Sequence, residues 1–506
     1  MQIISADAAA RLIEDSWTII PGGFGCCGHP EAITAALGRR FRAEGRPRNL
    51  SLLFAAGSGD RCGRGLDHLA QDGLVRRAIG GFWGFTPRLG AMAVAGKIDA
   101  HNWPQGVISQ LFRATAARLP GVLSRVGIGT FIDPDQDGGC LNATSQPGLI
   151  RRMEIDGASL LFYPTSSINC ALIRGTHVDE AGNLTMEHEV SYQDGLAQAQ
   201  AARNCGGIVI AQVAEVVARG SLRPQDVRVP GSLIDYVVVA DEADHPQTYA
   251  EAFNPAYVEA GLAGAPRARP IPLERRVVAR RALEEMRKHP GALVNLGIGI
   301  PSEIGLVAHQ AGYDDFTLTV ESGQFGGIPA SGLSFGASAH SQALIEQSAM
   351  FDLYDGGGID IAFLGFAQVD SAGNVNVSHF PGKTPGIGGF ANISRAAKRQ
   401  VFCGTFTAGG LDVDFADGAL RIRREGRERK FVPHVPKISF NGGMAARSGQ
   451  PVTYITERAV FELNNNCLKL KEVAPGIDID RDIVGQMGAS ILIGNNVREM
   501  DRHLFE

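Results

Sequence analysis

The chain has 506 residues, of which 44% are hydrophobic and 20% charged, and its net charge is −5. This length exceeds that over which a single hydrophobic core usually grows, so we expect two domains. Lysine and arginine form no basic cluster, which argues against nucleic-acid binding, and no apolar run approaches the roughly 20 residues that a bilayer requires. The first residues lack the order of a signal peptide, and the eight cysteines lack CxxC spacing, so we expect a cytoplasmic protein without a metal site.

Short apolar runs alternate with amphipathic segments along the whole chain. Runs that are apolar on both faces and are separated by helices are typical of parallel sheets covered by helices, so the predicted fold class is α/β. The predicted strands are Leu50–Phe54, Leu160–Tyr163, Ile208–Val213, Tyr236–Ala240, Leu293–Leu296, Phe316–Val320, Ile359–Leu364, Val401–Thr405 and Ser490–Ile493. The predicted helices include Pro30–Arg42 and Leu273–Lys288.

An internal repeat divides the chain. The pattern Val-Asp-x-Ala-Gly-Asn occurs at Val178–Asn183 and again at Val369–Asn374, each time followed by alternating apolar residues. Two weaker matches keep the same order, Gly22–Glu31 with Leu296–Glu303 and Ala199–Arg203 with Ser394–Lys398. We therefore predict two homologous α/β halves, residues 1–260 and 272–506. A linker rich in proline and alanine, from about Asp244 to Pro272, joins them.

A glycine-rich turn follows a strand-like segment that begins at Trp17. Gly23, Gly25 and Gly28 precede Pro30, which stands where a helix would begin. Such a turn offers backbone N–H groups to an anion, although a tight turn without a ligand remains the alternative. The pattern matches neither the dinucleotide fingerprint in its proper context nor a phosphate loop with its lysine.

The second candidate is an acidic residue at the end of a strand. The β-branched run Phe316–Val320 stops at Glu321, and Ser-Gly follows at once. Ligands of open α/β sheets bind at the carboxyl ends of strands, so Glu321 is well placed to face a crevice. A turn-capping role is the alternative.

Together these motifs resemble those of family I CoA transferases, in particular the fused-chain acetate and propionate branch. The resemblance spans nearly the whole chain. It is carried by Gly22-Gly-Phe-x-x-x-Gly-x-Pro30, Val294-Asn-Leu-Gly-Ile-Gly-Ile-Pro301, Val320-Glu-Ser-Gly323, Pro104-Gln-Gly106, Phe351–Gly358, Gly386-Ile-Gly-Gly389 and Tyr454–Phe461. The succinyl-CoA:3-oxoacid branch carries Ser-Glu-Asn-Gly where this chain has Val-Glu-Ser-Gly, which favours short monocarboxylates over 3-oxoacids.

The resemblance implies a fold, a chemistry and a set of site residues. Each half should be a three-layer α/β/α structure with a mostly parallel sheet, and Glu321 should form a thioester with CoA during ping-pong transfer. Coenzyme A or acyl-CoA would be a substrate, with no permanently bound cofactor, and the protein would be a homo-oligomer, for which a tetramer is one option. The implied oxyanion and substrate contacts are Gln105, Gly388 and Gly389, and the weaker candidates for CoA binding are Gly23, Gly25, Gly28, Arg395 and Lys398.

Other interpretations stay open at this point. Phe82, Trp83 and Phe85 are candidates for the wall of an acyl pocket and equally for core packing. We expect the glutamate to lie in a closed cleft between the halves, with Gly323–Gly332 and Pro381–Gly389 as closing loops, because thioesters and anhydrides hydrolyse. An acyl-CoA hydrolase on the same scaffold and a non-catalytic acyl-CoA-binding protein are the alternative functions.

Overall fold

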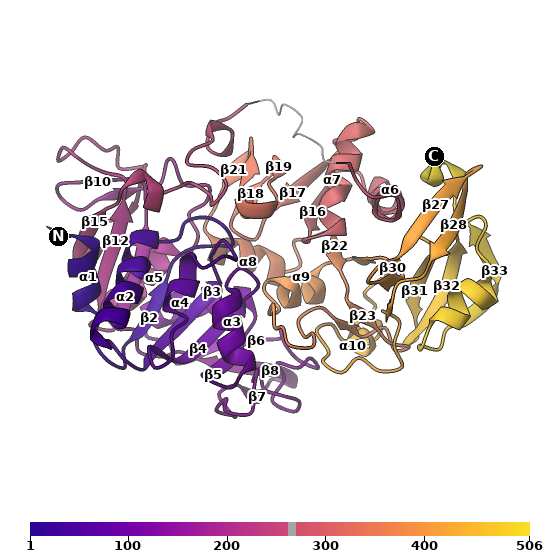
Figure 1. Ribbon diagram of the computed structural model, residues 1–506, viewed down its shortest axis with the longest axis horizontal. Helices are drawn as coiled ribbons and strands as arrows, with labels where there is room; N and C mark the ends of the chain where they lie inside the picture. The colour runs from indigo at the N-terminus through magenta and orange to yellow at the C-terminus, as the bar shows by residue number, and fades with distance from the viewer. Residues whose placement is uncertain (262–269) are drawn as a thin grey trace. The chain divides into compact units, whose positions relative to one another are not determined.

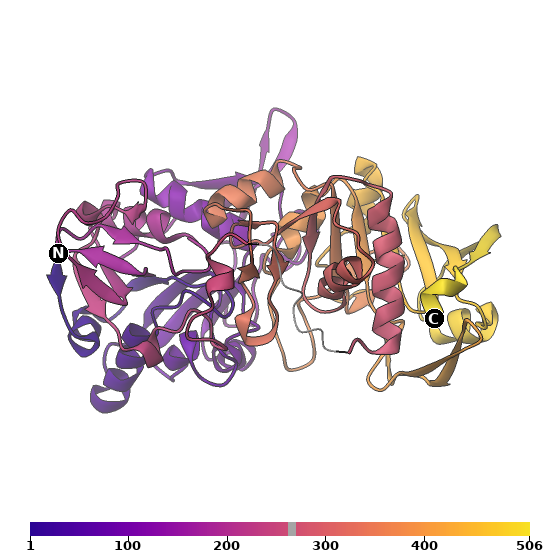
Figure 2. The same ribbon diagram turned by 90° about the horizontal axis from the view of Figure 1, so that it is seen from above.

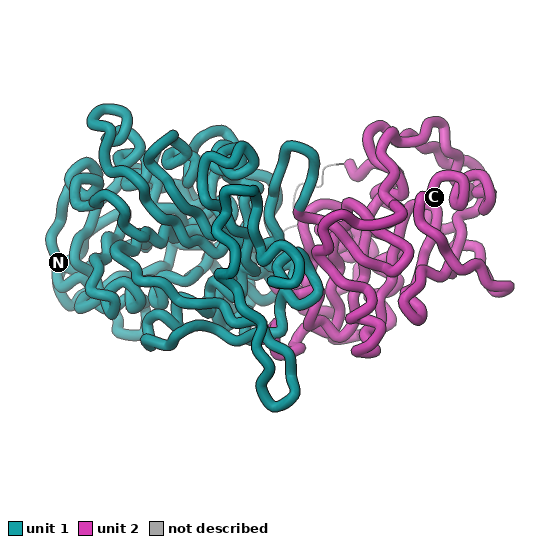
Figure 3. Tube along the Cα trace, turned by 90° about the horizontal axis from the view of Figure 1, so that it is seen from below, with its two compact units in different colours: residues 1–263, 320–352, 379–392 teal, residues 264–319, 353–378, 393–506 magenta. Residues whose placement is uncertain are grey.

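The computed structural model describes residues 1–261 and 270–506. The chain forms two compact units, coloured separately in Figure 3. Unit 1 comprises Met1–Ala263, Val320–Asp352 and His379–Asn392, and unit 2 comprises the remaining segments. Two segments of the predicted second half therefore belong to unit 1, and Glu321 is among them. Part of the predicted linker, residues 262–269, lies outside the described residues.

Unit 1 is built on a sheet of eight strands that all pair in parallel, in the order β1-β15-β12-β9-β2-β3-β4-β5 (Figure 1). The strands are β1 (Gln2–Ile3), β2 (Thr18–Pro21), β3 (Leu50–Ala56), β4 (Val75–Phe82), β5 (Asp99–Asn102), β9 (Cys170–Arg174), β12 (Ile208–Val213) and β15 (Tyr236–Val239). The prediction of a mostly parallel sheet is confirmed for this unit.

Helices cover both faces of this sheet. One apolar cluster joins Leu52 of β3 to α1 (Ala6–Leu12), α2 (Glu31–Glu44) and α3 (Pro87–Val94). A second cluster joins the next residue, Leu53, to α4 (Gln105–Ala116) and α5 (Gly195–Asn204). Successive side chains of a strand point to opposite faces, so burial on both faces explains why β3 is apolar at every position from Leu52 to Ala56. The result is the three-layer arrangement expected from the sequence.

Smaller sheets complete unit 1. A four-stranded sheet consists of β10 (His177–Asp179), β11 (Leu184–Thr185), β13 (Glu215–Val217) and β14 (Val227–Val229). An antiparallel sheet consists of β6 (Gly121–Ser124), β7 (Arg151–Ile155) and β8 (Ala158–Pro164), and Figure 2 shows the β7–β8 hairpin extending from the unit. The predicted strand Leu160–Tyr163 lies in this sheet and not in a parallel one. The short pairs are β18 (Gln324–Phe325) with β21 (Ala343–Leu344) and β19 (Ile328–Pro329) with β20 (Ser338–Ala339).

Unit 2 repeats the parallel core. Its strands follow the order β17-β16-β22-β25-β30-β31-β32-β33, in which the first five pair in parallel. Strand β31 is antiparallel to both β30 and β32, and β32 pairs with β33 in parallel. They are β16 (Ala292–Leu296), β17 (Phe316–Thr319), β22 (Ile361–Gly365), β25 (Gln400–Cys403), β30 (Val452–Ile455), β31 (Ala459–Asn464), β32 (Cys467–Val473) and β33 (Leu492–Glu499). The predicted buried strand Ser490–Ile493 is wrong in burial, because β33 is an edge strand and leaves Leu492 51% and Ile493 47% exposed.

The second half of the chain also contains helices and two-stranded pairs. The helices of the second half are α6 (Leu273–Arg287), α7 (Ile300–Gln310), α8 (Gln347–Asp355), α9 (Phe390–Ala396) and α10 (Gly442–Ser448). The two-stranded pairs are β23 (Gln368–Val369) with β24 (Val375–Asn376), β26 (Thr407–Ala408) with β29 (Glu428–Arg429), and β27 (Asp412–Ala416) with β28 (Ala419–Arg424). Within the described residues, no helix combines the length and the apolar composition that crossing a membrane requires.

The repeated motif folds identically in the two units. Asp179 accepts hydrogen bonds from the backbone N–H groups two and four residues later and from the side-chain amide of Asn183. Asp370 makes the same three contacts, the last with Asn374. Each asparagine Oδ1 in turn accepts a backbone N–H of a distant glycine, Gly231 and Gly442 respectively. The strand order β3-β2-β9-β12-β15 also matches β17-β16-β22-β25-β30.

Candidate active site

The segment that contains Glu321 is a tight turn. Strand β17 ends at Thr319, and the turn is closed by hydrogen bonds from Val320 N–H to Gln324 C=O (3.0 Å) and from Gly323 N–H to Val320 C=O (2.9 Å). Gly323 has φ +117°, and a Cβ there would lie 1.9 Å from the Ile345 carbonyl oxygen. Only glycine fits this position, which explains the Gly of the Glu-Ser-Gly motif.

Buried hydrogen bonds hold the residues that follow Glu321 in place. Ser322 is fully buried, and its Oγ donates a hydrogen bond to Gln324 Oε1 (2.7 Å). Gln324 Nε2 donates to the carbonyl oxygens of Gly336 (2.7 Å) and Val190 (2.9 Å). Within Val320–Gln324, Glu321 alone is partly exposed while the other four residues are buried. The turn therefore presents one side chain, and it is the carboxylate.

The environment of Glu321 disfavours its negative charge. Burial raises the pKa of the Glu321 carboxyl above its ordinary value, and a hydrogen bond from its own backbone N–H partly opposes this. Removing hydration from a carboxylate raises the free energy of the charged form. This cost disappears when the group becomes a neutral anhydride or thioester. Burial in this turn therefore destabilises the ionised form of Glu321 relative to any neutral form.

A second segment lies against this turn. Gly388 N–H donates to the Gly81 carbonyl at the end of β4 (2.9 Å), and Gly388 C=O accepts from Gln105 N–H at the start of α4 (3.0 Å). Ile387 N–H donates to Asn102 Oδ1 (2.8 Å). These bonds fix the Gly386–Gly389 segment at the carboxyl ends of β4 and β5, where ligands of parallel sheets bind.

The two predicted oxyanion glycines differ in what their N–H groups do. The N–H of Gly388 is already bonded to Gly81, so it has no donor left for a substrate. The N–H of Gly389 has no hydrogen-bond partner among the described residues. A Cβ on Gly389 would lie 3.1 Å from Glu321 Cγ and 3.2 Å from the ring of Phe351. Gly389 therefore contacts the carboxylate side chain and carries the available donor.

Gln105 lies beside the Gly388–Gly389 pair. It is only 3% exposed, and its Nε2 donates to Gln347 Oε1 (3.3 Å). A Cβ on Gly388 would lie 3.6 Å from Gln105 Oε1 and 3.3 Å from the ring of Phe82. Glu321, Gln105 and the glycine pair, which are far apart in the sequence, thus gather in one place within unit 1.

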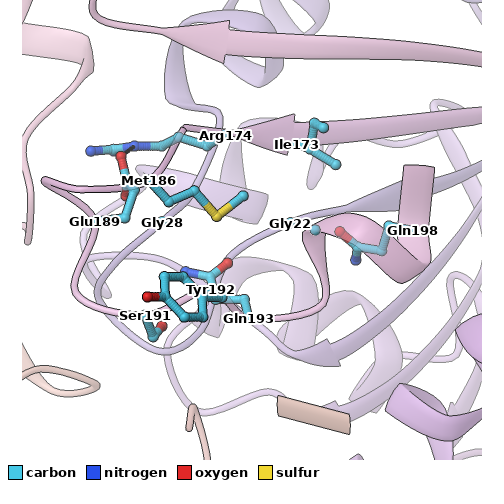
Figure 4. Close-up of a pocket in the computed structure, with 11 residues that line it drawn as sticks. Gly22, Gly28, Ile173, Arg174, Met186, Glu189, Ser191, Tyr192, Gln193 and Gln198 are labelled. Atoms are coloured by element: carbon cyan, nitrogen blue, oxygen red, sulfur yellow. Dashed lines mark hydrogen bonds and ion pairs between the residues drawn. The ribbon is translucent and has the colours of Figure 1, made fainter. Parts of the chain in front are cut away.

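The N-terminal glycine turn is closed by protein groups. Gly23 N–H donates to Gln193 Oε1 (2.8 Å), and a Cβ on Gly28 would lie 1.6 Å from Gln193 Nε2. A Cβ on Gly25 would likewise lie 2.7 Å from the ring of Phe335. Gly22 and Gly28 border a cavity of about 10 Å³, drawn in Figure 4, which has room for roughly one water molecule. The N–H of Gly23 thus already has a partner within the chain, and the contact of this turn with CoA stays a prediction.

The other predicted residues are spread over the chain. Arg395 and Lys398 belong to unit 2, where Lys398 Nζ pairs with Asp360 (2.8 Å) at the surface, and their contact with CoA stays a prediction. Trp83 and Phe85 are buried; Trp83 packs against Phe54 in the core, whereas Phe85 stacks on Phe335. Phe82 is half-buried and remains a candidate for the acyl pocket.

No sequence pattern pointed to three polar residues that lie next to Gln105. Gln347, Ser109 and Asp194 are buried and hydrogen-bonded to one another. Asp194 directly precedes helix α5, a position that predicts helix capping, yet its side chain makes no capping hydrogen bond. Within the described ranges, no group of histidine, cysteine and carboxylate side chains is arranged to hold a metal ion.

Substituting Gly389 by alanine tests its contact with Glu321. Gly389 lies outside the left-handed region of φ, so alanine suits its backbone, and the close contacts with Glu321 Cγ and the Phe351 ring are what oppose it. We expect Gly389→Ala to lower kcat about 100-fold, because a displacement of about 1 Å at a reacting group costs this much. Gly90→Ala in helix α3 is the matched control, since its Cβ would meet nothing closer than 4.0 Å. Equal kcat values for the two variants would contradict the contact.

The candidate site thus combines an α/β fold, a partly exposed glutamate just beyond the end of a strand and a neighbouring glycine whose N–H has no partner among the described residues. The coenzyme A transferase family model matches residues 3–240. Acetate CoA-transferase YdiF of Escherichia coli O157:H7 is 45% identical over 99% of this chain and 95% of its own, and caffeate CoA-transferase of Acetobacterium woodii is 44% identical over 100% and 97%. The crystal structure of E. coli YdiF as a thioester complex with CoA has a TM-score of 0.93 and 43% identity, and covers 100% of this chain and 96% of that chain.

The chain therefore belongs to the coenzyme A transferase family. Its predicted fold class and its resemblance to the fused-chain branch are confirmed by these full-length matches. It is an enzyme of the CoA-transferase class that uses CoA thioesters.

Proposed function

We propose that this enzyme moves CoA from a short-chain acyl-CoA to acetate or another short carboxylate through a thioester on Glu321. The observation that carries the proposal is the Glu321 turn, in which one carboxylate is presented against Gly389 while its neighbours are buried. The relatives named as acetate and caffeate CoA-transferases support the reaction type. The sequence departure at Val320-Glu-Ser-Gly323 supports monocarboxylates over 3-oxoacids.

The reaction proceeds through two exchanges at carbonyl carbons. The Glu321 carboxylate attacks the thioester carbonyl, the C–S bond breaks, and CoA leaves as a thiolate while a mixed anhydride remains. The thiolate then attacks the Glu321 carbonyl carbon, the anhydride C–O bond breaks, and the first carboxylate departs. An acceptor carboxylate reverses these steps. Charge and atoms balance without an external proton donor or an oxidant, and the kinetics are ping-pong.

The neighbouring groups have distinct parts in this scheme. Each tetrahedral intermediate carries an oxyanion, and Gly389, which lies against Glu321, has an N–H without a partner among the described residues. One such donor contributes about 3 kcal/mol to transition-state stabilisation. Gln105 contacts the carboxylate of the leaving or entering acid. Phe82 lies beside the same glycine segment and borders the acyl group.

The proposal extends to the cofactor, the location, the oligomeric state and the CoA-binding residues. Coenzyme A enters as a substrate, and the enzyme has no permanently bound cofactor. We place the reaction in the cytoplasm, in short-chain fatty acid metabolism with acetate or propionate, and we expect a homo-oligomer. Arg395 and Lys398 are the cations assigned to the CoA phosphates, with the turn at Gly23, Gly25 and Gly28 as a weaker contact. The two homologous halves are assigned to residues 1–260 and 272–506.

Acceptor dependence and trapping test the proposal. With propionyl-CoA as donor, acetyl-CoA should form only when acetate is present, and the thioester should be stable without it. Borohydride or hydroxylamine added after propionyl-CoA should modify Glu321, which peptide mass spectrometry locates. Thioester loss at the same rate without acetate would favour a hydrolase. An unmodified Glu321 peptide during active transfer would contradict the covalent step.

A further inference from the structure

A buried row of hydrogen-bonded side chains lies behind Gln105. Gln105 Nε2 donates to Gln347 Oε1 (3.3 Å), and Gln347 Nε2 donates to Asp194 Oδ2 (2.6 Å) and to Ser109 Oγ (2.7 Å). Ser109 Oγ also donates to Asp194 Oδ2 (2.9 Å). All four residues are buried and belong to unit 1. We call this row, Gln105, Gln347, Ser109 and Asp194, the amide relay.

The charge on Asp194 determines the direction of the amide relay. An ionised carboxylate only accepts hydrogen bonds, so the NH₂ group of Gln347 must face it. The Gln347 carbonyl then faces Gln105, whose NH₂ group donates to it, and Gln105 Oε1 lies beside Gly388. A protonated Asp194 can instead donate to Gln347 Oε1. Both amides then turn over, and Gln105 directs its NH₂ group toward Gly388.

The two hydrogen-bond directions of the amide relay differ in how well Gln105 binds a carboxylate. Carboxylate oxygens are acceptors, so Gln105 Oε1 repels them and the Gln105 NH₂ group binds them. Protonating Asp194 also removes one negative charge from the interior that receives the new anion. Both effects favour the same form. We propose that Asp194 is a positioning residue that takes up a proton when the acceptor carboxylate binds, reversing the amide relay so that Gln105 offers its N–H groups to the acid. This rests on the proposed function, in which Gln105 contacts the carboxylate.

The surroundings of Asp194 allow both protonation states near neutral pH. Burial raises the pKa of Asp194 to about 7, and the negative charge of nearby Glu346 raises it further, against the hydrogen bonds from Ser109 and Gln347. Burial also raises the pKa of Glu346, against the charges of Arg113 and Arg228. Arg113 on α4 pairs with Asp352 on α8 (2.5 Å) at the surface, and Arg228 lies over the ring of Tyr192.

The pH dependence of acceptor binding tests this role. The acceptor meets the enzyme after Glu321 has become a thioester, so Glu321 does not titrate in kcat/KM for acetate. We expect KM for acetate in the wild type to rise about tenfold from about pH 6.5 to about pH 8.5, because binding is linked to uptake of one proton. Asp194→Asn keeps the shape and can donate to Gln347 at every pH. Its KM should stay at the low value and change less than about twofold over this range.

Two further variants separate this role from a structural one. Asp352→Asn, at the exposed aspartate of α8, should retain the wild-type rise. Gln347→Leu breaks the amide relay, so its KM should be high and independent of pH. An Asp194→Asn enzyme that follows the wild-type curve, or that has a high KM throughout, would overturn the proposal. Trapping of Glu321 in each variant reports on the proposed function separately, since that label is lost only if the covalent step itself is absent.

Discussion

Glu321→Gln is expected to lower kcat for CoA transfer by about 10⁴-fold or more, the size of loss seen when a catalytic nucleophile is removed. The amide has nearly the shape of the carboxylate but cannot form the anhydride. Glu321→Ala should lose nearly all transfer, and Glu321→Asp about 100-fold or more, because a side chain shorter by one methylene misplaces the attacking oxygen. Steady-state transfer from propionyl-CoA to acetate measures all three.

Stability measurements keep this result from being confused with misfolding. Burial raises the pKa of Glu321, so its ionised form destabilises the fold above that pKa, and stability falls as pH rises through it. The neutral Glu321→Gln variant should therefore melt at the wild-type temperature or above it at neutral pH. Transfer by the wild type should fall as pH decreases, starting above the ordinary glutamate pKa. Glu154→Gln, at an exposed residue of β7, should leave kcat unchanged; a lower melting temperature for Glu321→Gln would argue against this account.

Glu31→Gln is expected to lower the free energy of unfolding of unit 1 by about 3 kcal/mol, the cost of breaking a buried charged pair. Glu31 Oε1 accepts from Arg64 Nε (3.2 Å) and His68 Nε2 (2.6 Å), and Oε2 accepts from Gly65 N–H (3.0 Å) and the Tyr249 hydroxyl (2.8 Å). Whichever oxygen becomes an NH₂ group, it then faces donors. Urea unfolding followed by tryptophan fluorescence reports on this unit, because all three tryptophans belong to it.

The loss should depend on pH in a defined direction. Burial alone would raise the pKa of Glu31, but the hydrogen bond from His68 and the neighbouring positive charges hold it well below its ordinary value. The stabilisation is therefore complete above the unfolded-state pKa of about 4.3 and is lost as pH falls below it. Glu44→Gln changes an exposed glutamate of the same helix, paired only with Arg40, and should cost less than about 0.5 kcal/mol. A difference between the two variants that persists undiminished at acidic pH would contradict the assignment.

Local sequence patterns predicted most of the fold. Ile208–Val213 coincides with β12, and the predicted helix Leu273–Lys288 is one residue longer than α6. These elements are defined by continuous apolar runs and by helical periodicity, which a single segment contains in full. Burial is different, because it depends on what covers a strand. Ser490–Ile493 has the composition of a core strand, but it overlaps the exposed edge strand β33.

The candidate site was predictable in part. Glu321 was found because the end of a β-branched run and the following Ser-Gly mark a turn in the sequence itself. The amide relay was missed because Gln105, Asp194 and Gln347 are far apart in the chain, and their spacing carries no pattern. Which glycine of the Gly388–Gly389 pair has a free N–H depends on the carbonyl of Gly81, another distant residue. Tertiary contacts, and not local propensity, decide such details.

The matching strand orders of the two units have a consequence for how many reaction centres each polypeptide holds. Glu321 stands two residues beyond the end of β17, and the corresponding residue beyond β3 is Ser58. Ser58 is 1% exposed, and its hydroxyl is hydrogen-bonded to the ring of His29. The position two residues beyond the matching strand thus holds a carboxyl in one unit's order and a buried hydroxyl in the other's. Under the proposed function, each polypeptide would therefore carry one CoA adduct, on Glu321.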